Sequence, residues 1–145
     1  MTQAVSQVAQ CDPVWSKVRE EAVALAAEEP ILASFVHATV LNHERLEDVL
    51  SFHLAQKLGN ADVPAMLLRQ VFDRAMHSDP EIATATRADI AAVYDRDPAC
   101  QASLEPLLVF KGFHSLQAYR VAHWLWREGR RAMALHVQNR ISEVF

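Results

Sequence analysis

Apolar residues recur at intervals of three and four along most of this chain, a spacing that places them on one face of an α-helix. Nowhere do β-branched residues alternate with polar ones over the length of a strand, and only three glycines are present. The pattern predicts an all-α protein, a multi-helix bundle of about seven to eight helices.

Prolines and glycines predict the ends of these helices. Five prolines follow an acidic residue, which suits an N-cap carboxylate with a first-turn proline; the pairs are Asp12-Pro13, Glu29-Pro30, Asp79-Pro80, Asp97-Pro98 and Glu105-Pro106. Asn42 is expected to cap a helix, Ser78 and Glu81 to form a capping box, and Gly129 to end a helix in the left-handed conformation. The expected helices are 13–27, 30–41, 42–58, one beginning near 62–64, one from the capping box to 94, 107–128 and 130–145.

Three details make this prediction specific. The segment 30–41 is apolar on most sides, so we expect it inside the bundle. Asp89 falls on the apolar face of its helix, where a carboxylate needs a partner, and Arg120 is the best candidate by residue type. The last helix is expected to bury Leu135 together with Ile141, Val144 and Phe145.

Composition is typical of one folded domain of ordinary size. The 145 residues are 51% hydrophobic and 22% charged, which argues against a disordered chain. Two lone cysteines, Cys11 and Cys100, and the lack of a signal peptide or a long apolar run predict a cytoplasmic protein that does not span a membrane. The expected organisation is a flexible N-terminus over residues 1–11, a helical domain over 12–129 and a last helix over 130–145.

Aromatic and basic residues are interleaved over residues 107–145, as in some surfaces that bind nucleic acid. The net charge of −4 argues against a polyanion as partner, because binding phosphates requires a basic surface. Gln117, Arg120, Trp124 and Arg127 recur at spacings of three, four and three, which places them in one helical stripe. We therefore favour a helix buried on several sides, whose basic groups pair with acids of neighbouring helices, over a nucleic-acid-binding strip.

The chain contains no complete catalytic constellation. None of the seven histidines has another three or four residues away, so no helical metal site is predicted, and nucleophile-elbow, zinc-protease and phosphate-loop motifs are absent. The corner Asp95-Arg96-Asp97-Pro98 places acidic side chains on an irregular segment, where ligand-binding residues are often found. Its spacing alone favours helix capping by Asp97 over ligand binding.

Longer motifs run through most of the chain. They are Glu29-Pro30-Ile31-Leu32-Ala33-Ser34-Phe35, His37-Ala38-Thr39, Arg96-Asp97-Pro98-Ala99, Lys111-Gly112-Phe113-His114, Leu116-Gln117-Ala118-Tyr119-Arg120, His123-Trp124-Leu125-Trp126, Gly129-Arg130-Arg131 and Gln138-Asn139. With these motifs the chain resembles the N-terminal helical domain of serine O-acetyltransferases, from about residue 12 to residue 145.

The resemblance implies a reaction to which this chain contributes only in part. In that family the helical domain precedes a left-handed β-helix of hexapeptide repeats, which carries the catalytic histidine and binds acetyl-CoA; no such repeat occurs in these residues. We therefore expect no catalytic, cofactor-binding or metal-binding residue here, and no activity from this chain by itself. The resemblance implies that Asp97 and Pro98 bind the substrate L-serine and the feedback inhibitor L-cysteine, and it reverses the preference for capping by Asp97.

The resemblance also implies an assembly and a pathway. The intact enzyme would convert acetyl-CoA and L-serine to O-acetylserine, the first step of cysteine biosynthesis, as a dimer of trimers joined by the helical domains. The next enzyme of the cysteine pathway is a candidate partner, whereas nucleic acid and membranes are not expected. The alternative is a free-standing helical oligomerisation or interaction module without enzymatic activity.

Overall fold

The computed structural model describes residues 12–145, and the expectation of a flexible segment over 1–11 lies outside these residues. Over the described residues the chain forms eight α-helices, one 3₁₀ turn and one π-helical turn, with no strand, which confirms the all-α prediction. In order they are α2 (Pro13–Glu28), η1 (Pro30–Leu32), α3 (Ala33–Val36), η2 (His37–Leu41), α4 (Leu46–Leu58), α5 (Ala65–Ser78), α6 (Pro80–Arg96), α7 (Leu104–Val109), α8 (Lys111–Arg127) and α9 (Arg131–Val144).

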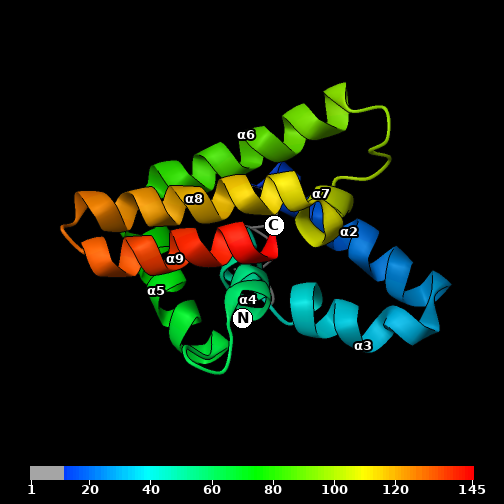
Figure 1. Cartoon of the computed structure of the whole chain (residues 1–145). Helices are drawn as coiled ribbons and strands as arrows, with labels where there is room; N and C mark the ends of the chain where they lie inside the picture. Colours follow the sequence, from blue (N-terminus) through cyan, green and yellow to red (C-terminus); the bar gives the residue numbers. More distant parts are fainter. Residues whose placement is uncertain (1–11) are drawn as a thin grey trace.

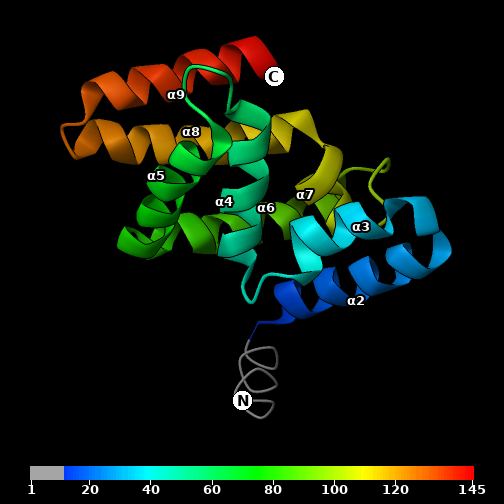
Figure 2. The same ribbon diagram turned by 90° about the horizontal axis from the view of Figure 1, so that it is seen from below.

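Helix α8 lies in the middle of the molecule, between α6 and α9, which run alongside it (Figure 1). Helices α4 and α5 pack across this layer, and α2 with α3 forms a pair at the opposite end of the molecule from α5 (Figure 2). The core draws fully buried side chains from most of these helices, among them Val18, Leu54, Phe72, Leu107 and Leu125. Because α8 is covered on several sides, its sequence carries apolar residues on more than one face.

Acid-proline pairs begin two of the helices as predicted. The Asp12 carboxylate accepts a hydrogen bond from the Trp15 backbone N–H at 3.2 Å, and that of Asp79 accepts one from the Glu81 N–H at 3.1 Å. The predicted capping box is wrong, because Ser78 is the last residue of α5 and Asp79 alone caps α6.

Three other predicted side-chain N-caps, those of Asn42, Glu29 and Glu105, are not found. Helix α4 begins at Leu46 after an extended Arg45, so Asn42 follows η2 instead of capping α4. Glu29 is the N-cap residue of η1, which begins at Pro30 as predicted, but its side chain makes no cap hydrogen bond. Pro106 lies within α7, whose N-cap residue is Ser103.

The expectation that segment 30–41 is buried is wrong. The chain bends by 120° between α2 and this segment, so the segment lies at the edge of the bundle and packs mainly on α2. Ile31 is 93% exposed and Phe35 44%, while Val36 and Val40 point into the core. No single helix among the described residues is long and apolar enough to cross a membrane; this bent pair meets that test only by length and composition.

The helix predicted over 107–128 is broken at Phe110, which separates α7 from α8 in an extended conformation. Carbonyl groups in the last turn of α7 would be left without partners, but two imidazoles supply the donors. His114 Nε2 donates to the Leu107 carbonyl at 2.7 Å, and His53 Nε2 donates to that of Leu108 at 3.1 Å. These contacts stabilise the break, and no proline or glycine at position 110 marks it in the sequence.

The two histidines lie side by side in the core, with ring centroids 5.2 Å apart. Burial is the main cause that lowers the pKa of His53 to about 4, and it also lowers the pKa of His114, while the Lys57 ammonium acts in the same direction on both. Both rings are therefore neutral near pH 7, and each carries its proton on Nε2, where the carbonyl accepts it.

The prediction that Asp89 pairs with Arg120 is confirmed. Arg120 Nη2 lies 2.7 Å from Asp89 Oδ2, and the fully buried Gln117 donates to the same oxygen at 2.8 Å. Thr86 completes the network by donating to the Gln117 side-chain oxygen at 2.9 Å. One stripe of α8 thus satisfies polar groups of α6, as the spacing of its residues indicated.

Two aromatic residues of α8 are exposed, whereas Phe113 and Trp124 are buried. Arg127 pairs with Asp79 at 3.0 Å, which agrees with the predicted pairing, but Tyr119 is 53% exposed and Trp126 50%. The Arg131 guanidinium lies 5.2 Å from the centroid of the Trp126 ring. The rings of Tyr119 and Trp126 therefore lie at the surface beside α9.

A left-handed turn at Gly129, with φ of 76°, ends α8 as predicted and turns the chain into α9. Helix α9 buries Ala134 and Val137. The expected burial of Leu135 is wrong, because this side chain is 42% exposed, whereas Ile141, Val144 and Phe145 are partly buried against the core. The hairpin returns the chain to the first turn of α8, where the Phe145 ring lies 5.7 Å from that of His114.

Candidate functional site: the Asp97 loop

The Asp97 loop, residues 97–103, connects α6 to α7 at one end of the molecule (Figure 1). Asp97 has an extended backbone, and its Oδ1 accepts a hydrogen bond from the Ala99 N–H at 2.9 Å. The Cys100 N–H donates to the Asp97 carbonyl at 3.0 Å. Asp97 therefore forms an Asx turn.

The alternative interpretation of Asp97 as a helix N-cap is wrong, because no helix starts at Pro98 and α7 begins only at Leu104. The side chain is partly exposed, and within residues 12–145 only one of its two oxygens accepts a hydrogen bond. The second oxygen, Oδ2, is free to accept from a ligand. Pro98, next to it, is exposed at the turn.

Two other carboxylates hold the loop in place. Glu105 Oε2 accepts from the Gln101 N–H at 2.9 Å, and Glu21 Oε2, from α2, accepts from the Leu104 N–H at 2.9 Å. The local sequence could not predict this role of Glu21, because Glu21 lies 83 residues before its partner. The only local signal for Glu105 was its place before a proline, and that signal predicted a different role.

The loop also buries a thiol. Cys100 is 7% exposed and donates to the Ala102 carbonyl at 3.3 Å. Burial is the main cause that raises the pKa of this thiol, and the carboxylates of Glu105, Asp97 and Glu21 add to the effect. The thiol is therefore protonated near pH 7 and is a poor nucleophile in this position.

A single carboxylate oxygen can bind and orient a ligand but cannot complete a catalytic centre. An ionised carboxylate only accepts hydrogen bonds, so its natural partners are ammonium, hydroxyl and amide groups. Within the described residues no group of three or more His, Cys, Asp or Glu side chains is arranged to hold a metal ion. The chemistry of the remaining Asp97 oxygen therefore suits a ligand that is rich in hydrogen-bond donors.

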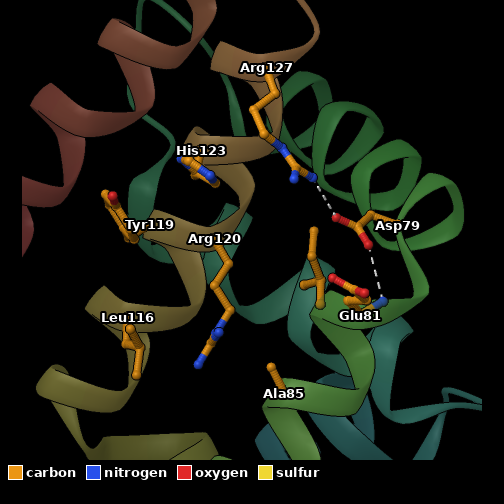
Figure 3. A pocket seen from close by; sticks show the side chains of 9 residues that line it. Asp79, Glu81, Ala85, Leu116, Tyr119, Arg120, His123 and Arg127 are labelled. Carbon is orange, nitrogen blue, oxygen red and sulfur yellow. Dashed lines mark hydrogen bonds and ion pairs between the residues drawn. The ribbon is translucent and has the colours of Figure 1, made fainter.

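A pocket of about 360 Å³ lies away from this loop, between the first turns of α6 and the middle of α8 (Figure 3). Arg127 points to Asp79 across the pocket, Asp79 accepts from the Glu81 backbone, and Arg120 is already paired with Asp89. Both arginines of this pocket are therefore already paired with carboxylates. Asp97 follows the other end of α6, a 17-residue helix about 25 Å long, so pocket and loop are separate features.

Comparison with known proteins identifies the family. The family model described as "Serine acetyltransferase, N-terminal" matches residues 14–118, which is most of the chain and includes the Asp97 loop. The chain belongs to the serine acetyltransferase family. The resemblance inferred from the sequence motifs is therefore confirmed.

Serine acetyltransferase relatives are similar over nearly all of this chain. The serine acetyltransferase of Escherichia coli (strain K12) is 50% identical over 132 residues, which are 91% of this chain and 48% of the relative. Serine acetyltransferase 4 of Arabidopsis thaliana is 48% identical over 134 residues, which are 92% of this chain and 38% of the relative. The chain thus spans about half the length, or less, of these relatives.

Solved structures of the family share this fold. Serine acetyltransferase from Brucella abortus strain S19 matches with a TM-score of 0.90 and 43% identity, covering 92% of this chain and 55% of that chain. The Neisseria gonorrhoeae serine acetyltransferase in complex with serine matches with a TM-score of 0.89 and 48% identity, covering 90% of this chain and 54% of that chain. Other similar structures are serine acetyltransferase complexes with cysteine and with CoA.

Proposed function

We propose that this chain acts within a longer serine acetyltransferase, which transfers an acetyl group from acetyl-CoA to L-serine, and that Asp97 binds the serine. The observation that carries the proposal is the free Oδ2 of Asp97, held on a fixed turn at the surface of a chain that belongs to this family. Family members solved with serine, with cysteine and with CoA support these as the ligands of the intact enzyme.

The chemistry of the substrate suits this role. Serine offers an ammonium and a hydroxyl group, both hydrogen-bond donors, and the Asp97 carboxylate can accept from either. In the reaction a base outside these residues would remove the hydroxyl proton, and the serine oxygen would attack the thioester carbon; the carbon–sulfur bond would then break, and the CoA sulfur would leave and take up a proton. Asp97 would fix the amino acid in place for that attack, a proximity effect. Cysteine carries the same ammonium group and would compete for the same oxygen.

The length of the relatives is consistent with a site that is shared with further residues of the intact enzyme. This chain covers 48% of the Escherichia coli relative. In relatives about twice as long, a continuation would supply residues that this chain does not contain. The remaining groups of the site, with the acetyl-CoA position, would come from that continuation.

We further assign an assembly role to the exposed apolar surface at the N-terminal end of the bundle. Its large side chains are Val23 on α2, Ile31 and Leu32 on η1, and Phe35 on α3. Large apolar side chains that are exposed on neighbouring elements are typical of an interface between subunits. A cytoplasmic location and a contact with the next enzyme of the pathway stay predictions. The alternative of a module without enzymatic activity is not favoured, because the relatives similar over nearly all of this chain are enzymes.

Replacement of Asp97 tests the substrate role in the longer enzyme. Asp97→Asn keeps the size and one oxygen but removes the charge, so a lost charge-assisted hydrogen bond of about 1.5–3 kcal/mol should raise the serine KM about 10- to 100-fold. The inhibition constant for cysteine should rise by a similar factor, while the acetyl-CoA KM stays constant. Asp95→Asn, at an exposed position two residues earlier on α6, is the control. Unchanged serine and cysteine constants would remove Asp97 from the site.

Replacement of Ile31 tests the assembly role. Ile31→Asp places a charge in the apolar surface and should lower the sedimentation coefficient toward that of a smaller species at micromolar concentration. Met66→Asp is the matched control, because Met66 is also exposed, at 74%, but lies on α5. If both variants sediment like the parent chain, self-association does not use this surface.

A further inference from the structure

We propose that Glu21 is a positioning residue for Asp97, and this inference rests on the substrate role proposed for Asp97. Glu21 lies on α2, and its Oε2 accepts the hydrogen bond of the Leu104 N–H at 2.9 Å, at the point where the Asp97 loop ends. Leu104 is buried, so this N–H would be without a partner if the carboxylate were removed. The bond ties the loop to a helix that is distant in sequence.

Helix α2 contacts the other end of the loop as well. Lys17 lies one helical turn before Glu21, on the same face of α2, and its Nζ lies 3.6 Å from the centroid of the Tyr94 ring. Tyr94 is in the last turn of α6, immediately before the loop. One face of α2 thus contacts the chain both before Asp97 and after it.

The loop depends on these contacts because it has little structure of its own. Between the end of α6 and the start of α7 it contains only turns, held by Asp97 Oδ1, the Glu105 carboxylate and the Cys100 thiol. Helix α2, in contrast, is fixed at its start. Trp15 Nε1 donates to the Glu44 carbonyl at 2.9 Å. A displacement of about 1 Å in a substrate-positioning group can lower the rate about 100-fold. The hydrogen bond from the loop to the fixed helix α2 should therefore help to orient serine.

Kinetics of variants in the longer enzyme test the role. Glu21→Ala removes the acceptor and should raise the serine KM about tenfold, with the acetyl-CoA KM unchanged. Glu21→Gln removes the charge but retains an oxygen for the Leu104 N–H, so it should stay within about threefold of the parent enzyme. Glu20→Ala, an exposed carboxylate on the same turn, is the control. Equal rises in both KM values, or no rise for Glu21→Ala, would overturn the proposal.

The effect of Glu21 on the loop can also be measured without catalysis. In the 145-residue chain with a Cys11→Ser background, the rate at which a thiol reagent labels Cys100 reports how well the loop is held. Cys100 is buried in the loop, so Glu21→Ala should expose it and raise the labelling rate about tenfold. Glu21→Gln controls for the change in charge near the thiol and should label like the parent. Equal labelling rates for the Ala variant and the parent would show that Glu21 does not hold the loop, even if the Ala variant of the longer enzyme fails to assemble.

Asp97→Asn, assayed in parallel, separates the two proposals. If it raises the serine KM and Glu21→Ala does not, the positioning role of Glu21 is wrong and the substrate role of Asp97 stands. If it leaves the serine KM unchanged, the substrate role is wrong, and with it the positioning of serine through Glu21.

Discussion

Protonation of the buried histidine His53 should make the fold sensitive to acid. Its imidazole is 5% exposed and donates to the Leu108 carbonyl. The neighbouring His114 ring and the Lys57 ammonium both disfavour a positive charge on His53. The pKa of His53 is lowered from its ordinary value near 6.5 to about 4 in the folded protein. The unfolded chain therefore binds a proton at a pH where the folded chain does not.

The sign and size of the effect follow from this difference. Above about pH 6.5 both states are neutral at this residue and it adds no pH dependence; as the pH falls from 6.5 toward 4, the unfolded state gains protons and the folded state loses stability. With these two pKa values, the loss between about pH 7 and about pH 5 is about 2 kcal/mol. The lowered pKa of His114 acts in the same direction.

Urea unfolding of a His53→Gln variant isolates the contribution. The Gln amide can still donate to the Leu108 carbonyl but does not titrate, so stability relative to the parent should improve by about 2 kcal/mol on going from about pH 7 to about pH 5. Other ionisable groups cancel in the comparison, provided that their environment is unchanged. Ser51→Ala, a fully buried substitution on the same helix that removes no titratable group, should show the same stability difference at both pH values.

A His53→Gln stability difference that does not change with pH would refute this reasoning. It would mean that the imidazole is protonated equally easily in the folded and unfolded states, by way of solvent that reaches the ring or an acid that pairs with it. The neutral, carbonyl-capping role of the two histidines at the end of α7 would then be wrong.

Three further predictions concern stability and activity. Asp89→Ala should lower the free energy of unfolding, measured with urea, by about 2 kcal/mol, because the buried Gln117 amide loses its acceptor. Asp73→Ala, which removes an exposed ion pair, should lower it by less than about 0.5 kcal/mol. Equal losses would contradict the network. Gly59→Ala should cost about 1–3 kcal/mol, since its Cβ would lie 2.6 Å from a backbone nitrogen of α5. Gly112→Ala, with nothing within 4 Å of the new Cβ, should be neutral or stabilise by up to about 1 kcal/mol. The 145-residue chain, mixed with acetyl-CoA and L-serine, should release no CoA above the rate without protein, and measured turnover would disprove its inactivity.

Features with local signals could be predicted from the sequence. An acid before a proline predicted the N-caps at Asp12 and Asp79, and a glycine after a basic, aromatic helix predicted the left-handed turn at Gly129. The pairing of Asp89 with Arg120 followed from the cost of leaving a carboxylate alone on an apolar face. Each of these depends on a few neighbouring residues or on one strong energetic requirement.

Features that depend on distant parts of the chain could not be predicted. The break at Phe110 is stabilised by His53 from another helix, and the exposure of Ile31 follows from the bend after α2, which its own apolar pattern does not encode. For the site, the family motif indicated Asp97, but its anchor Glu21 is far away in sequence and carries no motif. Periodicity shows which residues face the core, but it does not identify a distant backbone group, such as the Leu104 N–H, that a side chain binds.

The ion-pair cluster at the start of α2 has a consequence for the order of folding. Arg87 on α6 binds both Asp12 and Glu47, at 2.6 and 2.8 Å, and so joins helices α2, α4 and α6 across 75 residues of chain. Such a contact requires a large loop to close, while the hairpins α4–α5 and α8–α9 need only neighbouring segments. The hairpins should therefore form before the folding transition state and the Arg87 cluster after it, so that loss of Arg87 speeds unfolding and leaves the folding rate nearly unchanged. The cluster then affects the lifetime of the native state, set by the unfolding rate, more than it affects the folding rate.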